Sequence, residues 1–167
     1  MEIIKGFPDK ELQNLLKESL IKKPYLLSHT RGRIRDRKFV KELQNNGFKW
    51  IKSGISRDVF IKGKYVLKVT KINTGVLTNK NEIEIYQKYK RTGDFTKIFS
   101  YDKRYRWIIT EKVEYPDNEL RVKYAKKLRE KYKNNKDILF DLHARNIGVK
   151  ESKPVILDYG GYYKNAK

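Results

Sequence analysis

The sequence contains no cysteine, and this absence excludes a disulfide framework and any zinc site built on thiolates. It also lacks an apolar run approaching the ~18 residues that a membrane span needs, and its N-terminus has no apolar signal core. We therefore expect a cytoplasmic protein without a membrane partner.

Acidic residues are scarce relative to basic ones. The 167 residues include 40 Lys and Arg against 20 Asp and Glu, which gives a formal net charge of +20. Such a charge favours association with nucleic acid, nucleotides or an acidic protein partner. A lysine-rich solvated surface explains the same count without a partner, and no zinc-finger, leucine-zipper or RNA-recognition signature is present. Charge alone leaves the partner open.

Hydrophobic residues make up only 38% of the chain, but their regular spacing predicts a folded core. Helices are predicted from Pro8 to Pro24, over residues 36–46 and 79–91, and from Pro116 to Asn134. Strands are predicted over residues 48–52, 58–62, 65–69, 96–101, 105–113, 138–140, 147–149 and 155–157, with turns at Gly63-Lys64 and near Pro154.

Two polar segments near the end of the sequence combine carboxylates with an amide. Residues 141–146 read Asp-Leu-His-Ala-Arg-Asn, and Asp158-Tyr159-Gly160 follows a later apolar run. Magnesium prefers oxygen ligands and usually takes one or two protein carboxylates together with phosphate oxygens. The two segments therefore predict a magnesium ion held against a nucleotide phosphate.

A lysine and a glycine turn upstream extend this prediction. Lys68 lies in the apolar strand 65–69, where an unpaired ammonium is costly, so we expect a carboxylate or phosphate partner. An outward-facing lysine on an edge strand is the alternative. Gly54 and Ser56 lie between two strands, where backbone N–H groups and a hydroxyl can approach a phosphate, although an ordinary hairpin turn explains them too.

Glu82 and Glu84 are candidates for the carboxylate beside Lys68, because a helix packed on a sheet can place a carboxylate over a strand. Asn79 and Glu82 also have capping-box spacing, in which Glu82 would merely satisfy the N-terminus of its helix. We favour Glu82 over Glu84 as the partner.

In their order along the chain, these residues resemble the protein-kinase-like fold, which includes small-molecule kinases and abbreviated kinase-like proteins of bacteria and phages. The family has a Gly-containing hairpin, a strand lysine, a helix glutamate, a hinge, a catalytic loop with Asp and Asn, and a metal-binding Asp-x-Gly. The sequence supplies, in that order, Gly54, Lys68, Glu82, Glu111, Asp141 with Asn146, and Asp158-Tyr159-Gly160.

The resemblance implies an α+β, minimal protein-kinase-like fold. It would have an antiparallel N-lobe sheet with one packed helix and a truncated helical C-lobe, preceded by two helices. The expected divisions are a helical extension over residues 1–47, an N-lobe over 48–113 and a truncated C-lobe over 114–167.

The resemblance also implies ATP and Mg²⁺ as cofactors and assigns a role to each residue. Lys68, paired with Glu82, would bind the α- and β-phosphates near Gly54 and Ser56, while Glu111 and Val113 would belong to the hinge that meets adenine. Asp141 would accept the proton of a substrate hydroxyl, and Asn146 and Asp158 would hold magnesium. His143 stands where protein kinases usually have lysine, as in antibiotic and small-molecule kinases.

Two departures from the family pattern leave two functions open. Leu139-Phe140 replaces the usual His-Arg, and the sequence ends soon after Gly160, so we expect no activation segment or peptide-docking platform. One function is a miniature phosphotransferase acting on a hydroxyl of a protein or small molecule. The other is a catalytically weak or inactive kinase-like protein that contacts a host protein or nucleic acid.

Overall fold

The computed structural model describes residues 37–161, which divide into two compact units. The first unit takes in the chain up to Val76 together with Phe99–Thr110. The second takes in Leu77–Ile98 and the chain from Glu111 onward. The helix expected between Pro8 and Pro24 lies outside the described residues.

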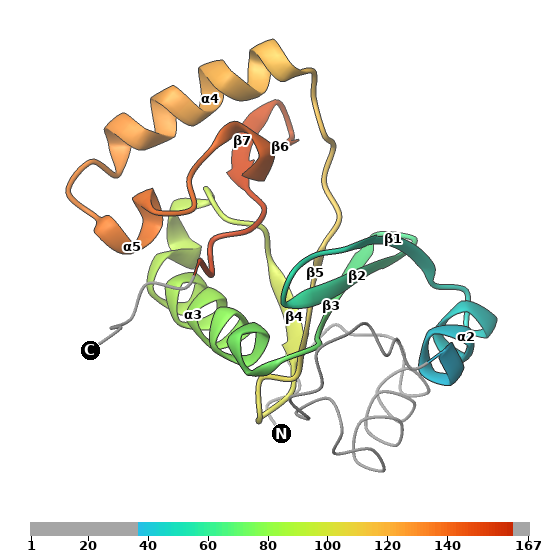
Figure 1. The fold of residues 1–167 in the computed structure, drawn as a ribbon. Helices are drawn as coiled ribbons and strands as arrows, with labels where there is room; N and C mark the ends of the chain where they lie inside the picture. Colours follow the sequence, from blue (N-terminus) through green and yellow to red (C-terminus); the bar gives the residue numbers. More distant parts are fainter. Residues whose placement is uncertain (1–36, 162–167) are drawn as a thin grey trace. The chain divides into compact units, whose positions relative to one another are not determined.

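A five-stranded sheet forms the framework of the first unit, in the order β1-β2-β3-β5-β4 (Figure 1). The strands are β1 (Lys49–Ser53), β2 (Arg57–Lys62), β3 (Tyr65–Thr70), β4 (Ile98–Tyr101) and β5 (Trp107–Glu111). The first three form antiparallel neighbours, and Gly63 turns between β2 and β3 with a φ of 52°. Each predicted strand of this region is therefore present, within a few residues of its expected ends.

Alternation along the strands gives this sheet an apolar face, which α2 (Arg37–Asn45) helps to cover through Val40 and Leu43. Gly47, with a φ of 78°, follows the helix as predicted. The buried core residues of the first unit are Leu43, Phe48, Phe60, Leu67, Val69, Trp107 and Ile109.

Helix α3 (Asn73–Tyr89) begins six residues earlier than the sequence pattern predicted, at Asn73 rather than Asn79. Its first turns contain Thr74 and Gly75, which have low helix propensity. For this reason the sequence pattern does not predict that the helix begins at Asn73. Gly75 is there because a Cβ would lie 2.4 Å from the Ser56 carbonyl oxygen. Glu82 consequently lies inside the helix, and the capping-box interpretation of Glu82 is wrong.

The second unit contains the remaining helices and a hairpin. They are a 3₁₀ turn (Lys90–Thr92), α4 (Asn118–Lys131), α5 (Lys136–Leu139), a second 3₁₀ turn (Ala144–Asn146), β6 (Ile147–Lys150) and β7 (Lys153–Ile156). Asp117 caps α4 by accepting a hydrogen bond from the Leu120 N–H at 2.8 Å, as its position after Pro116 suggests. The core of this unit joins Phe95, Ala125, Leu128, Tyr132, Ile138, Leu142, Ile147, Ile156 and Tyr159.

One local prediction in this unit is wrong, and another is confirmed. Residues 138–140 are not a strand, because the Asn135 side chain accepts a hydrogen bond from the Ile138 N–H at 3.3 Å and starts the short helix α5. The turn expected near Pro154 is present at Glu151 and Ser152, which have φ values of 49° and 61°, and Pro154 itself pairs with Val149 inside β7.

The protein is thus α+β, with a five-stranded antiparallel sheet and few helices, consistent with the minimal kinase-like fold that the sequence led us to expect. Across residues 37–161, no helix combines the length and the apolar character that crossing a membrane requires.

Candidate functional site

The loop between α5 and β6 is closed by hydrogen bonds among Asp141, His143 and Asn146. The Asp141 carbonyl accepts from the His143 N–H at 3.1 Å and from Asn146 Nδ2 at 2.9 Å, and the Asn146 N–H donates to the His143 carbonyl at 2.8 Å. Because its amide nitrogen is used inside the loop, Asn146 has Oδ1 as the side-chain atom able to bind a cation.

His143 lies against both of its neighbours in this loop. Its Nε2 is 3.4 Å from Asp141 Oδ1 and 3.4 Å from Asn146 Nδ2. These separations are contacts rather than strong hydrogen bonds. The imidazole is therefore positioned to influence the orientation of the Asp141 carboxylate.

The second motif approaches this loop through the backbone. The Leu157 N–H donates to the Asn146 carbonyl at 2.8 Å, so Asp158 follows directly after a residue bonded to Asn146. Within residues 37–161, no group of three or more His, Asp or Glu side chains is gathered for a metal. A magnesium ion bound by Asn146 and Asp158 would need phosphate oxygens to complete its coordination.

Tyr159 anchors the segment that carries Asp158. Its side chain is 1% exposed, its hydroxyl donates to the Thr96 carbonyl at 3.1 Å, and its ring packs on that of Phe95 with centroids 4.9 Å apart. Burial raises the pKa of Tyr159 well above its usual value, and the nearby negative charge of Glu82 raises it further. Tyr159 therefore fixes the backbone next to Asp158, the candidate metal ligand.

Glu82 and Glu84 have different surroundings on α3. Glu82 is fully buried, and a Cβ added to Gly160 would lie 3.0 Å from the Cβ of Glu82. Glu84 is exposed and pairs with Lys80 at 3.8 Å on the surface. The structure thus places Glu82, rather than Glu84, against the Asp158–Gly160 segment, while its pairing with Lys68 of the first unit stays a prediction.

Lys68 is a buried cation in the middle of a sheet. It lies opposite Val59 in β3, a strand flanked by β2 and β5, and its side chain is 6% exposed. The alternative of an outward-facing lysine on an edge strand is therefore wrong.

The turn that contains Gly54 and Ser56 is stabilised by hydrogen bonds, two of which come from Lys71, the residue that follows β3. The Gly54 N–H donates to the Arg57 carbonyl at 2.8 Å, and the Lys71 N–H donates to the Ser56 carbonyl at 2.8 Å. The Lys71 ammonium also donates to the Gly54 carbonyl. Sequence reasoning did not single out Lys71, because its partners are backbone carbonyls, which carry no sequence signal.

The predicted hinge is fixed by the side chain of Glu111. Its carboxylate accepts from the Lys97 N–H at 3.0 Å and from Lys150 Nζ at 2.8 Å, and this second hydrogen bond raises the pKa of Lys150. Val113 packs so closely on β6 that a Cβ at Gly148 would lie 2.6 Å from Val113 Cγ2. The Glu111 carboxylate is therefore occupied inside the fold.

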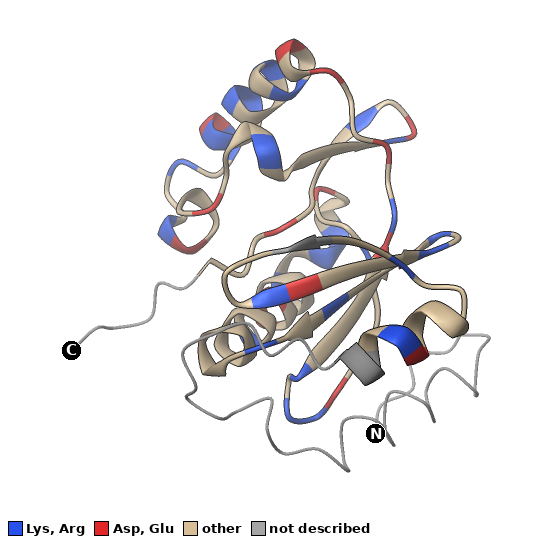
Figure 2. Cartoon of the chain, turned by 45° about the vertical axis from the view of Figure 1, so that its right-hand side comes forward, with Lys and Arg blue, Asp and Glu red and all other residues tan. Residues whose placement is uncertain are grey.

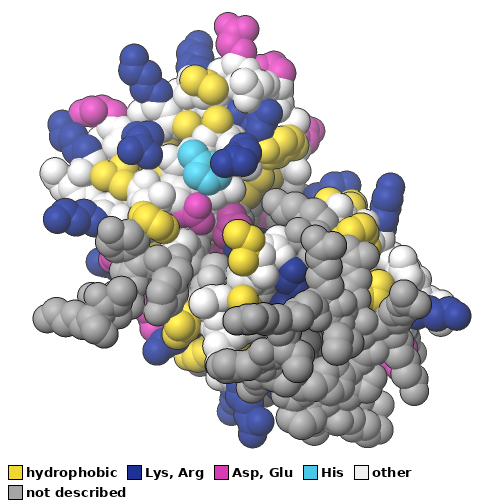
Figure 3. Space-filling view, in the orientation of Figure 1, with side chains coloured by type: hydrophobic (Ala, Val, Ile, Leu, Met, Phe, Trp, Pro, Cys, Tyr) yellow, Lys and Arg dark blue, Asp and Glu magenta, His cyan; other side chains and the backbone are white. Residues whose placement is uncertain are grey.

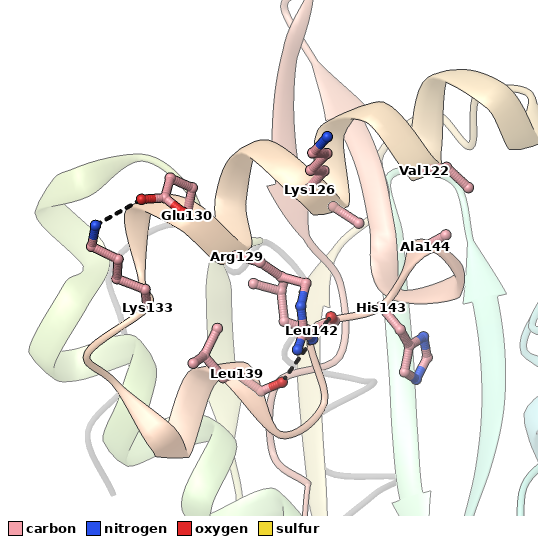
Figure 4. A pocket seen from close by; sticks show the side chains of 10 residues that line it. Val122, Lys126, Arg129, Glu130, Lys133, Leu139, Leu142, His143 and Ala144 are labelled. Carbon is pink, nitrogen blue, oxygen red and sulfur yellow. Dashed lines mark hydrogen bonds and ion pairs between the residues drawn. The ribbon is translucent and has the colours of Figure 1, made fainter.

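Arg129 of α4 is a site residue that sequence reasoning missed. Its Nη1 donates to the Leu142 carbonyl at 2.8 Å and to the Leu139 carbonyl at 3.3 Å, one on each side of Asp141 (Figure 4). Nothing in the sequence distinguishes this arginine from the other cations of α4.

No protein-family model and no curated protein matches the sequence. Among solved structures, the chain is similar to APH(2″)-IIa in a ternary complex with streptomycin and ATP, at 12% sequence identity and a TM-score of 0.46. The match covers 78% of this chain and 72% of that chain. A likeness of this degree establishes no family.

Proposed function

We propose that this protein is a miniature ATP- and magnesium-dependent phosphotransferase that acts on a hydroxyl group of a protein or small molecule. The supporting observation is the arrangement of Asp141, Asn146 and Asp158, which two hydrogen bonds bring into one region: Asn146 Nδ2 to the Asp141 carbonyl and Leu157 N–H to the Asn146 carbonyl. A candidate base and two candidate metal ligands are what phosphoryl transfer requires of a protein.

Asn146 and Asp158 would hold the metal, which would neutralise charge on the phosphates. Lys68 would add a cation at the α- and β-phosphates, and the backbone of the turn at Gly54 and Ser56 would donate to phosphate oxygens. The hinge backbone at Glu111 and Val113 would bind adenine. These roles agree with the burial of Lys68 and with the use of the Glu111 carboxylate inside the fold.

Asp141 would act as the base in the transfer. As the acceptor oxygen bonds to the γ-phosphorus, the bond from that phosphorus to the β–γ bridging oxygen breaks and ADP leaves. The hydroxyl proton passes to the Asp141 carboxylate and from there to solvent. His143, 3.4 Å from Asp141 Oδ1, would orient the carboxylate toward the acceptor.

Turnover measurements on Asp141 variants test this proposal. Asp141→Asn should keep ATP binding while ATP turnover falls about 10²–10⁴-fold, the usual contribution of a general base. Asp137→Asn, which changes an exposed carboxylate on α5, is the matched control and should keep full turnover.

Robust turnover by the double variant Asp141→Asn/Asp158→Ala would contradict the proposal. Intact magnesium-dependent ATP binding without turnover in the unmodified protein would favour the alternative, a kinase-like protein that acts by contact with a host protein or nucleic acid.

A further inference from the structure

A tyrosine that belongs to none of the sequence motifs donates a hydrogen bond to the loop of the candidate base. The Tyr115 hydroxyl donates to the Arg145 carbonyl at 3.0 Å. Tyr115 lies between the predicted hinge and α4, within the second unit, and it is 55% exposed. Its ring is therefore not a core residue, and what its hydroxyl holds is the backbone of the loop.

This hydrogen bond fixes the peptide group directly before Asn146. The Arg145 carbonyl and the Asn146 N–H belong to one planar peptide group. The N–H of that group donates to the His143 carbonyl at 2.8 Å, and its carbonyl accepts from Tyr115. Because both polar ends of the plane are bonded, the plane has little freedom to rotate. The side chain of Asn146, a candidate metal ligand, starts from the Cα attached to this plane.

Tyr115 is itself held by Arg121 of α4. Arg121 Nη1 donates to the Tyr115 hydroxyl oxygen at 2.5 Å, and the guanidinium lies over the ring, 4.2 Å from its centroid. Arg121 also donates to the Asp117 carbonyl at 3.3 Å and to Asn118 Oδ1 at 3.4 Å. A hydroxyl has one proton and two lone pairs, so accepting from Arg121 leaves the phenol proton for the Arg145 carbonyl. The first turn of α4 thus orients the hydroxyl.

We propose that Tyr115 is a positioning residue that keeps Asn146 Oδ1 in place for the metal, with Arg121 holding the hydroxyl. This inference rests on the proposed phosphotransferase function and adds a residue to that same site. Arg129 holds the loop on both sides of the candidate base instead. Tyr115 should therefore act on metal-dependent binding, whereas Arg129 should act on turnover.

The measurement has to separate the metal from the positive charge of the chain. Figure 2 shows Lys and Arg recurring along α4, and Figure 3 shows them spread over the surface that faces the viewer. These cations attract ATP with or without magnesium. The informative quantity is therefore the gain in ATP affinity that magnesium produces, rather than ATP affinity itself.

ATP titration of Tyr115→Phe in the full chain tests the proposal, because this substitution removes the hydroxyl and keeps the ring. The magnesium-dependent gain in ATP affinity should fall about two- to tenfold, the effect of one net hydrogen bond. ATP affinity without magnesium should stay the same. Tyr124→Phe makes the same chemical change at a half-buried tyrosine of α4 and should leave both affinities unchanged.

Arg121→Gln tests the second half of the proposal. It removes the cation that holds Tyr115 and should reduce the magnesium-dependent gain as much as Tyr115→Phe does. The double variant should show no further loss, because both substitutions act through one hydroxyl. Lys123→Gln removes the same charge from an exposed position of α4 and is the control for net charge.

Hydrogen exchange at the Asn146 amide, measured by NMR, tests the hold on the loop without any nucleotide. Exchange should be about two- to tenfold faster in Tyr115→Phe than in Tyr124→Phe. Equal exchange in the two variants would overturn the proposal. An unchanged magnesium-dependent gain in Tyr115→Phe, or an equal loss of ATP affinity with and without magnesium, would overturn it too.

The unmodified protein keeps the two proposals apart. If magnesium produces no gain in its ATP affinity, the phosphotransferase is rejected, and the role of Tyr115 in holding a metal ligand is rejected with it. If magnesium produces the same gain in the unmodified protein and in Tyr115→Phe, only the role of Tyr115 is rejected.

Discussion

Gly160 shows how tightly the segment after Asp158 packs against α3. A Cβ at this position would lie 2.2 Å from the Thr78 carbonyl oxygen, far closer than packed atoms approach. The obstacle is backbone inside a helix, so it has little freedom to move. The glycine of the Asp-x-Gly pattern is therefore required here by packing, independently of any family resemblance.

We predict that Gly160→Ala lowers the free energy of unfolding by about 1–3 kcal/mol, the usual cost of overpacking, and weakens magnesium-dependent nucleotide binding because Asp158 shifts. Chemical denaturation and ATP titration measure the two effects. Lys80→Ala is the control, since it removes only a surface ion pair with Glu84 at 3.8 Å from an exposed position on the same helix α3. Equal effects of the two substitutions would show that the Gly160 contact has no special importance.

Single residues were predictable from the sequence where their neighbours in the chain define their environment. Lys68 is an example, because an ammonium in an apolar strand implies burial, and it is buried. Arg129 was not predictable, because its partners are the carbonyls of Leu139 and Leu142, and any residue offers a carbonyl.

Whole elements were predicted well where hydrophobic periodicity is strong, as in α4 and the strands β2 and β3. The start of α3 at Asn73 was not predicted, because its first turn has low helix propensity. Close packing of Gly75 on Ser56, which the sequence does not reveal, overrides that propensity. Residues 138–140 are apolar and short, a pattern that strands and buried helices share. The Asn135 side chain decides the outcome in favour of α5.

Helix α4 holds the loop of the candidate base through one arginine. We predict that Arg129→Ala lowers turnover about tenfold or more while ATP affinity changes much less, because the loop carbonyls lose their donor and Asp141 loses its orientation. Arg129→Lys should recover part of the activity, since an ammonium can still donate to the Leu142 carbonyl. Steady-state kinetics and ATP titration separate the two effects.

Lys127→Ala, at an exposed position on the same helix, is the control for Arg129 and should leave turnover unchanged. A loss of ATP affinity as large as the loss of turnover would indicate that Arg129 supports the fold of the unit rather than the position of the base.

At the scale of the whole molecule, the two units have separate cores and both carry predicted site residues. The first carries Lys68 with the Gly54 turn, and the second carries Asp141, Asn146 and Asp158. The net charge of +20 makes association with anions favourable for both, without identifying which anion is bound. The magnesium dependence of binding distinguishes a nucleotide held at the proposed site from an anion attracted by net charge alone. Only the former would use Asn146 and Asp158 to hold a metal on its phosphates.

The most direct test of the central claim is calorimetric titration of ATP with and without magnesium, on the unmodified protein and on Asp158→Ala. We expect magnesium to tighten ATP binding to the unmodified protein by about tenfold or more, equivalent to at least about 1.4 kcal/mol. Asp158→Ala should lose this difference and keep only the weak, salt-sensitive binding that its positive charge provides. The same magnesium dependence in both proteins, or none in either, would contradict the account.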